Sequence, residues 1–155
     1  MDYKTNAMRI LDKHKIAYKA YSYVDTDAVS GVEVAAALGQ DPAQVFKTLV
    51  TLSKSRTHYV FLIPVAEELD LKKAAHSVGE KSVEMIKSKE LLPATGYVHG
   101  GCSPLGMKKN FVTTIHETAK VFDTIIFSAG KIGYQVELNP ADLARIMPIS
   151  FAELV

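Results

Sequence analysis

The sequence has little of several features that define particular protein classes. It contains one cysteine and no tryptophan, so an internal disulfide and a disulfide-rich secreted scaffold are excluded. Lysine plus arginine (18) nearly balance aspartate plus glutamate (17), which argues against coating nucleic acid through bulk charge. No apolar run approaches the roughly 20 residues that cross a bilayer, and the N-terminus lacks a signal-peptide core. We therefore expect a cytoplasmic protein that does not enter a membrane.

Potential metal ligands are also sparse and scattered. The five histidines form no HxxxH or HxH pair, and there is no CxxC motif. The sequence therefore predicts neither a metal site nor a bound cofactor. The remaining composition is ordinary, since 155 residues with 48% apolar and 23% charged side chains can bury one core. We expect residues 1–155 to form a single domain.

Local patterns predict a mixture of helices and strands. Helical spacing, capping residues or terminal glycines mark four expected helices: 3–14, 30–39, 70–79 and the segment after Asn139. Runs rich in β-branched and aromatic residues mark six expected strands: 16–24, 45–52, 58–65, 111–115, 121–127 and 134–138. Because helices and strands do not alternate regularly, we expect an α/β protein of the mixed α+β class, with a mainly antiparallel sheet flanked by helices.

The first candidate site is a loop region rich in glycine. Four of the nine glycines lie between Gly96 and Gly106, which suits a backbone that turns sharply and approaches a ligand closely. Its N–H groups could bind an oxyanion or a phosphate, or the segment is a turn-rich connection without a ligand. Cys102 lies within it, in "GGCSPLG", without a Cys/His/Asn signature. We interpret Cys102 as a small loop thiol, with a catalytic thiolate as the competing hypothesis.

Two further candidates are lysine and serine residues on expected strands. Lys47 is a charge inside the apolar run "VFKTLVTL", where a desolvated ammonium group is costly. It should reach water, a carboxylate or an anionic ligand, and the simpler alternative is a lysine that snorkels from an edge strand. In "SAGKIG", Ser128 ends one strand and Lys131 lies between two glycines. This segment reads as a hairpin loop whose serine hydroxyl caps the turn or faces a ligand.

Five motifs follow one another along nearly the whole chain: "VFKTLV", "PVAEELDLKKAA", "VEMI", "TGYVHGGCSPLGMKK" and "FSAGKIGYQVEL". In this order they resemble the YbaK family, free-standing relatives of the bacterial prolyl-tRNA synthetase editing domain. The resemblance implies a compact mixed sheet that is partly closed, with surrounding helices and a pocket beside the glycine loop. It also implies an enzyme that hydrolyses mischarged aminoacyl-tRNA in trans, most typically Cys-tRNA(Pro).

The resemblance also assigns roles to residues. The family's G-x-x-x-P loop is matched by Gly100 and Pro104, and its active-site lysine by Lys47. Backbone N–H groups of residues 100–103 would stabilise the oxyanion of the ester, with no nucleophile from the protein. The predicted catalytic residues are Lys47, Gly100, Gly101, Cys102, Ser103 and Pro104. The predicted substrate-binding residues are Tyr23, Thr48, Ser128 and Lys131.

The chain departs from close relatives at Cys102, where isoleucine is common, and at Gln135, where an acidic residue is frequent. The expected partner is the acceptor end of aminoacyl-tRNA. Because the small net charge predicts weak tRNA binding by the chain alone, prolyl-tRNA synthetase is a second candidate partner. Candidates for acceptor-stem contacts are Lys72, Lys73, Lys108, Lys109 and Lys131. Two alternatives stay open: a deacylase for another small aminoacyl-tRNA such as Ala-tRNA(Pro), and a non-catalytic module that binds tRNA or a nucleotide.

Overall fold

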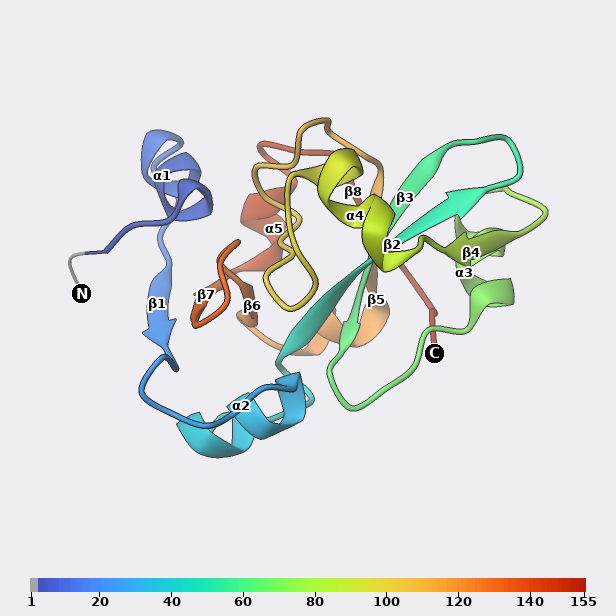
Figure 1. The fold of residues 1–155 in the computed structure, drawn as a ribbon. Helices are drawn as coiled ribbons and strands as arrows, with labels where there is room; N and C mark the ends of the chain where they lie inside the picture. Colours follow the sequence, from blue (N-terminus) through green and yellow to red (C-terminus); the bar gives the residue numbers. More distant parts are fainter. Residues whose placement is uncertain (1–2) are drawn as a thin grey trace.

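The structure is a computed structural model that describes residues 3–155, and its strands form two sheets (Figure 1). The strands are β1 Lys19–Ser22, β2 Phe46–Ser53, β3 His58–Pro64, β4 Val83–Met85, β5 Thr113–His116, β6 Ile125–Ser128, β7 Tyr134–Leu138 and β8 Ile149–Ala152. The larger sheet has the order β4-β2-β3-β5-β8, and the smaller one has the order β1-β7-β6. A bridge between Val45 and Ile126 connects the two sheets.

Helices surround these sheets, and the caps expected from the sequence are present. The helices are α1 Asn6–Lys13, α2 Gly31–Leu38, α3 Leu71–Ser77, α4 Ser88–Thr95 and α5 Pro140–Leu143, with a 3-10 helix at Glu117–Val121. At the start of α2, the Ser30 N–H donates to the Glu33 carboxylate (2.9 Å) and the Glu33 N–H to the Ser30 hydroxyl (3.2 Å). This capping box holds the first turn of α2. No helix within residues 3–155 is long and apolar enough to cross a membrane.

The predicted mixed fold with mainly antiparallel pairing is confirmed. The pairs β1–β7, β6–β7, β2–β3 and β2–β4 are antiparallel, whereas β3–β5 and β5–β8 are parallel. Strands β2 and β3 pair from Phe46 opposite Pro64 to Leu52 opposite His58. The strands are divided between two sheets, which diverge beside the Val45–Ile126 bridge.

Helix α4 and strand β8 are not predicted by the sequence patterns. Helix α4 contains Pro93, and its N-cap residue Lys87 makes no side-chain capping hydrogen bond, so the usual start signal is missing. Strand β8 has only four residues and is held by parallel pairing with the distant strand β5. The predicted strand 121–127 is shortened to β6, because its first residue ends the 3-10 helix and β6 begins at Ile125.

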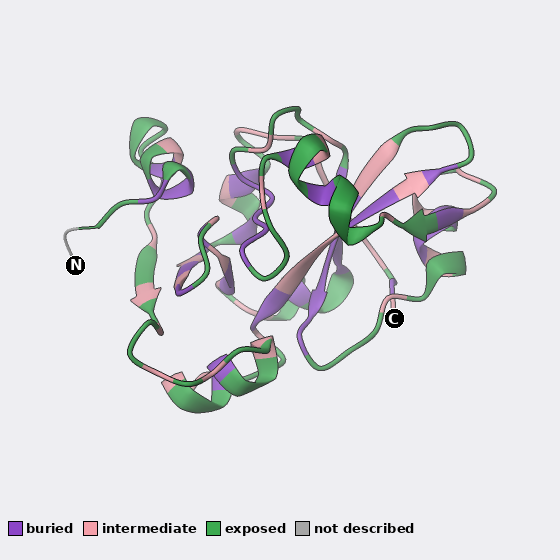
Figure 2. Cartoon of the chain, in the orientation of Figure 1, coloured by how far each residue is buried: buried purple, intermediate pink, exposed green. Residues whose placement is uncertain are grey.

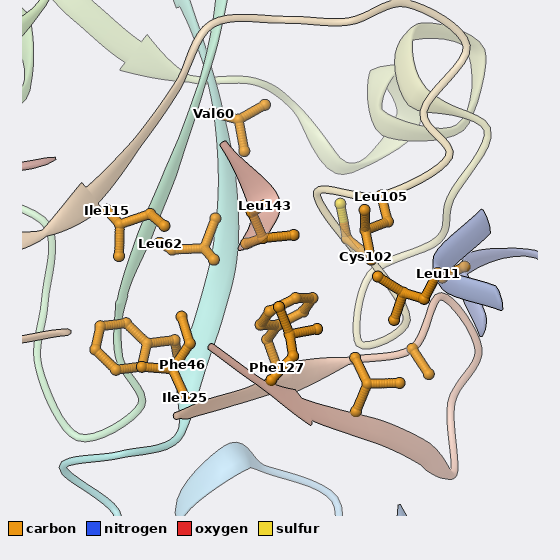
Figure 3. Packing of buried hydrophobic residues seen from close by; sticks show 14 of the residues in the cluster. Leu11, Phe46, Val60, Leu62, Cys102, Leu105, Ile115, Ile125, Phe127 and Leu143 are labelled. Atoms are coloured by element: carbon orange, nitrogen blue, oxygen red, sulfur yellow. The ribbon is translucent and has the colours of Figure 1, made fainter. Parts of the chain in front are cut away.

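The main hydrophobic core lies where the two sheets face each other (Figure 3). Phe46, Val60 and Leu62 of the larger sheet belong to the same buried cluster as Ile125 and Phe127 of the smaller one. Figure 2 shows buried segments at the centre of the molecule and exposed helical surfaces around it. Full burial of each such side chain contributes about 1.5–3 kcal/mol to stability. This packing fixes the position of β2 relative to the β6–β7 hairpin.

Candidate active site

A cavity of about 430 Å³ opens beside β2 where the two sheets diverge. At one end Val45 bridges to Ile126, and beyond the other end the Ile86 N–H donates to the Val50 carbonyl (3.2 Å). Strand β4 pairs with β2 only over Thr51–Ser53. The β2 edge between these ends therefore has no strand beside it. The start of α2, the β4–α4 segment, the glycine-rich loop (residues 96–106) and the β6–β7 hairpin complete the cavity wall.

The fold brings part of the predicted site together around this cavity. Six of the predicted residues line it: Tyr23, Lys47, Thr48, Gly100, Cys102 and Ser128. Four others do not line it: Gly101, Ser103, Pro104 and Lys131. The six lining residues come from segments that are distant in sequence. They share one cavity because no strand within residues 3–155 pairs with the β2 edge beside it. The other four residues belong to the loop behind the wall, except for the exposed Lys131.

Lys47 brings a positive charge to the cavity wall. It lies on β2 opposite Ile63 and is half-buried. Within residues 3–155, no carboxylate lies within 4.0 Å of its ammonium group. An unpaired ammonium on a cavity wall attracts a phosphate or an electronegative ester oxygen. Next to it in sequence, Thr48 Oγ1 is buried and makes no hydrogen bond with any described residue, so it is a further polar atom for a bound group.

Two glycines give the glycine-rich loop its shape for different reasons. Gly100 has φ +88°, in the left-handed region that side chains disfavour. A Cβ on Gly101 would lie 3.1 Å from the backbone nitrogen of Ile132, so the loop packs closely against the β6–β7 hairpin. Ser103 is fully buried, and its hydroxyl accepts a hydrogen bond from the Leu105 N–H (3.2 Å). The Ser103 side chain therefore stabilises the turn.

The structure corrects one part of the predicted oxyanion site. The Gly101 N–H donates to the Val98 carbonyl (3.0 Å), so it is not free to bind a substrate oxygen. The N–H groups of Gly100, Cys102 and Ser103 make no hydrogen bond with any residue in the described part of the chain. Gly100 and Cys102 also line the cavity. These two residues therefore combine a place on the cavity wall with a backbone N–H that makes no hydrogen bond within residues 3–155.

Cys102 packs into the main hydrophobic core. Only 6% of the residue is exposed, and Figure 3 shows its sulfur beside Leu105. Burial raises the pKa of the Cys102 thiol to about 12. Because the thiolate is the nucleophilic form of cysteine, this thiol is unreactive at neutral pH. The environment supports the interpretation of a small buried thiol over that of a catalytic nucleophile.

The β6–β7 hairpin presents one hydroxyl to the cavity and one lysine to solvent. Ser128 Oγ accepts a hydrogen bond from the Gly130 N–H (3.1 Å), so it caps the turn while lining the cavity. Lys131 is exposed, and its ammonium donates to the hydroxyl of Tyr3 (3.0 Å). Ser128 can therefore contact a bound group directly, whereas Lys131 lies outside the wall.

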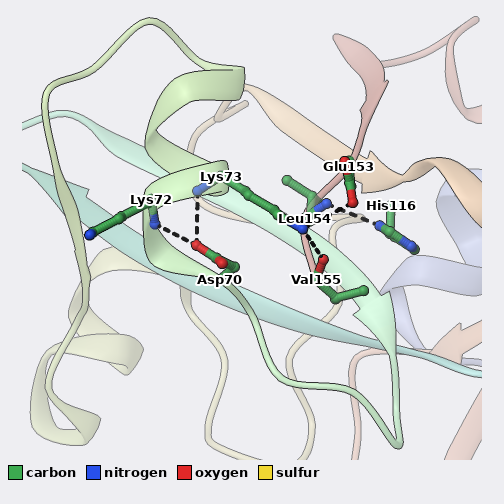
Figure 4. A network of polar contacts seen from close by, with 7 residues as sticks. All are labelled: Asp70, Lys72, Lys73, His116, Glu153, Leu154 and Val155. Carbon is green, nitrogen blue, oxygen red and sulfur yellow. Dashed lines mark hydrogen bonds and ion pairs between the residues drawn. The ribbon is translucent and has the colours of Figure 1, made fainter.

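Lys72 and Lys73, which were candidates for tRNA contacts, belong to a separate network (Figure 4). Lys73 Nζ lies 2.9 Å from a carboxylate oxygen of Glu153 and donates to the Val155 carbonyl (2.6 Å). Asp70 accepts from the backbone N–H groups of both lysines (3.0 Å each). None of these residues lines the cavity. The network ties α3 to the C-terminal segment.

Other residues of the cavity wall carry no site signal in the sequence. They include Val29, Val32, Met85, Ile86, Ser88, Leu91, His99 and Tyr134. Several belong to the β4–α4 segment, and without α4 no pattern places that segment beside β2. Val29 (84% exposed) and Val32 face solvent at the start of α2, which only the structure shows.

Comparison with known proteins identifies the family of this chain. Residues 26–146 match the family described as the aminoacyl-tRNA editing domain. The chain belongs to this family. An Enterococcus faecalis protein named "Putative Cys-tRNA(Pro)/Cys-tRNA(Cys) deacylase EbsC" is 46% identical over 152 residues, which cover 97% of this chain and 93% of that protein. A proline–tRNA ligase of Shouchella clausii is 34% identical over 76 residues, which are 49% of this chain and 13% of the ligase.

The fold of this editing domain is also found among solved structures. One described as "a putative trans-editing enzyme for prolyl tRNA synthetase" superposes with a TM-score of 0.81 at 21% identity, covering 99% of this chain and 98% of that one. At this identity the likeness concerns the fold alone. The resemblance drawn from the sequence motifs is confirmed, and the chain is an aminoacyl-tRNA deacylase, an ester hydrolase that edits mischarged tRNA.

Proposed function

We propose that residues 1–155 act as one editing domain that hydrolyses mischarged tRNA for proline, Cys-tRNA(Pro) foremost. The observation that carries the proposal is the meeting of an unpaired cation, Lys47, with free N–H groups of Gly100 and Cys102 around one cavity. Its volume of about 430 Å³ is suited to a small amino acid esterified to a ribose. The relative named as a Cys-tRNA(Pro)/Cys-tRNA(Cys) deacylase supports cysteine as the amino acid.

The proposed mechanism relies on the protein backbone. The ester carbonyl oxygen becomes anionic in the transition state, and donors fixed in advance stabilise that charge. The N–H groups of Gly100 and Cys102 are these donors, with Ser103 behind them. Lys47 holds the terminal phosphate or the ester in register. Tyr23 and Ser128 line the same cavity and position the ribose and the amino acid.

The attacking group comes from the substrate or from water. When the thiol of an esterified cysteine attacks its own carbonyl, a C–S bond forms and the C–O bond to the ribose breaks. The thiol proton passes to the departing ribose oxygen, which leaves as the free tRNA hydroxyl. The acyl product is a cyclic thioester, and water opens its C–S bond to give free cysteine. Cys102 takes no part, because its buried thiol stays protonated.

Ala-tRNA(Pro) is the second candidate substrate, since alanine is also small and its ester needs the same oxyanion stabilisation. The formal net charge of +1 gives little general attraction to tRNA. We therefore propose prolyl-tRNA synthetase as a partner that delivers the mischarged tRNA. The half-chain similarity to a proline–tRNA ligase is consistent with this pairing.

The test is a panel of purified aminoacyl-tRNAs incubated with the pure protein. It contains Cys-tRNA(Pro), Ala-tRNA(Pro), Pro-tRNA(Pro) and Cys-tRNA(Cys), each scored for released amino acid. We expect Cys-tRNA(Pro) to be deacylated fastest and Pro-tRNA(Pro) to be spared. Fastest release from Ala-tRNA(Pro) would favour the second candidate, and inactivity across the panel would favour a binding module.

A further inference from the structure

The cavity contains a positive charge and no carboxylate. Among the residues of 3–155 that line it, none is aspartate or glutamate. Its titratable side chains are Tyr23, Lys47, His99, Cys102 and Tyr134. An α-ammonium group on the bound acyl chain would therefore meet the cation Lys47 and find no counter-ion. Repulsion between like charges grows where a cavity wall excludes water.

Seven acidic residues lie within two positions of lining residues, and none of them lines the cavity itself: Asp25, Asp27, Glu33, Glu67, Glu84, Glu90 and Glu137. Glu33 accepts a hydrogen bond from the Ser30 backbone at the α2 cap. Glu137 accepts from the hydroxyls of Tyr21 and Thr124 (2.5 Å each). The carboxylates of Glu33 and Glu137 are thus engaged in hydrogen bonds within the protein.

Gln135 is a neutral polar residue of the cavity wall. It lies on β7, is only 5% exposed and lines the cavity. The Gln40 amide nitrogen donates to Gln135 Oε1 at 2.8 Å. This bond occupies the acceptor end of the Gln135 amide. Its Nε2 makes no hydrogen bond with any other described residue, which leaves it as a donor to a bound group.

We infer that the cavity binds the acyl group with its α-amine uncharged, and that Gln135 sets this preference. The inference rests on the proposed function. A neutral amine accepts a hydrogen bond from Gln135 Nε2, whereas an ammonium group has no lone pair to do so. An α-hydroxyl group also accepts this bond and is never cationic. Esters of α-hydroxy acids on tRNA are therefore a further substrate class for this chain.

The test compares alanyl-tRNA(Pro) with lactyl-tRNA(Pro), in which a hydroxyl replaces the α-amine. For each ester, kcat/KM is divided by the spontaneous hydrolysis rate, which corrects for the intrinsic activation of the aminoacyl ester. An α-amine with a pKa of about 7.7 is neutral in about 6% of molecules at pH 6.5 and in about 86% at pH 8.5. We expect a lactyl preference of about tenfold at pH 6.5 that nearly disappears at pH 8.5.

Two variants isolate the role of Gln135. Gln135→Glu keeps the acceptor for the Gln40 amide and adds a negative charge, so the lactyl preference at pH 6.5 should disappear or reverse. Gln135→Met, neutral and of similar length but without an N–H donor, should reduce the preference without reversing it. If Gln135→Glu does not fold, the two wild-type ratios decide alone.

The possible outcomes separate the inference from the proposed function. Hydrolysis of both esters with no wild-type preference at pH 6.5, or an unchanged ratio in folded Gln135→Glu, would overturn the inference only. Failure to hydrolyse either ester while Cys-tRNA(Pro) is hydrolysed would also overturn the inference only. Failure on Cys-tRNA(Pro) as well would overturn the proposed function, and the inference with it.

Discussion

Replacing Cys102 by alanine should leave deacylation of Ala-tRNA(Pro) within about threefold of the wild-type rate. With a thiol pKa of about 12, the thiolate fraction at pH 7.5 is only about 3 × 10⁻⁵. An ordinary exposed cysteine would be ionised in roughly one molecule in ten. Alanine retains the backbone N–H that the proposed oxyanion site needs. Ala-tRNA(Pro) is the right substrate because it has no thiol of its own.

The same substitution should cost stability. Cys102 is 6% exposed within the main core, and deleting its sulfur leaves a small void that costs about 1–2 kcal/mol. For a chain of this length such a loss lowers the melting temperature by several degrees. Rates should therefore be measured well below the melting temperature of the variant, alongside denaturant unfolding. Cys102→Ser tests the same donor with a polar side chain.

A catalytic thiolate would behave differently in this experiment. Removal of a nucleophile that forms the covalent intermediate costs several orders of magnitude in rate. The reasoning is refuted if folded Cys102→Ala loses more than about 10³-fold on Ala-tRNA(Pro) and an acyl thioester can be trapped on the wild type. Slow alkylation of the native protein by iodoacetamide is the expected companion result.

Lys47→Ala should reduce the deacylation rate by about 10²-fold or more with little change in melting temperature. Lys72→Ala, which lies outside the cavity, should match the wild type in rate and in melting temperature. Equal rates in the two variants would remove Lys47 from the mechanism. Gly101→Ala should cost about 1–3 kcal/mol of stability and at least tenfold in rate, because the added Cβ pushes the loop away from the backbone of Ile132 and moves the N–H donors. A wild-type rate in this variant would show that the position of the donors does not limit the reaction. The free energy of unfolding should fall as the pH rises above about 9, because the unfolded chain then releases the Cys102 proton that the folded chain keeps up to about pH 12. Cys102 alone lowers this free energy by about 1.4 kcal/mol per pH unit in that range. Denaturant unfolding from pH 8 to 11 should show a shallower decline in Cys102→Ala, and identical slopes would contradict the raised pKa.

Elements with local signals were predictable from the sequence. Ser30 and Glu33 mark the start of α2 because a capping box involves only neighbouring residues. The runs that form β2 and β3 are adjacent in the chain and pair as expected. Strand β8 lacks such a signal, because its pairing with β5 depends on contacts between distant segments. Helix α4 was hidden by Pro93 and by the absence of a side-chain cap.

The site was predictable to a similar degree. Lys47 stands out as a charge within an apolar run, an anomaly that needs no fold to be recognised. The direction of the Gly101 N–H depends on loop dihedral angles, so only the structure shows that Val98 occupies it. Likewise, Gln40 and Gln135 are far apart in sequence, and their hydrogen bond exists only because the fold brings the segment after α2 beside β7.

The most direct test of the proposed function is single-turnover deacylation of Cys-tRNA(Pro) by the purified protein in excess. We predict release of cysteine at least about 10²-fold faster than spontaneous hydrolysis, as expected when fixed donors stabilise the oxyanion. Pro-tRNA(Pro) should stay charged under the same conditions. Release of cysteine at the spontaneous rate, with the protein folded and the tRNA intact, would contradict the central claim.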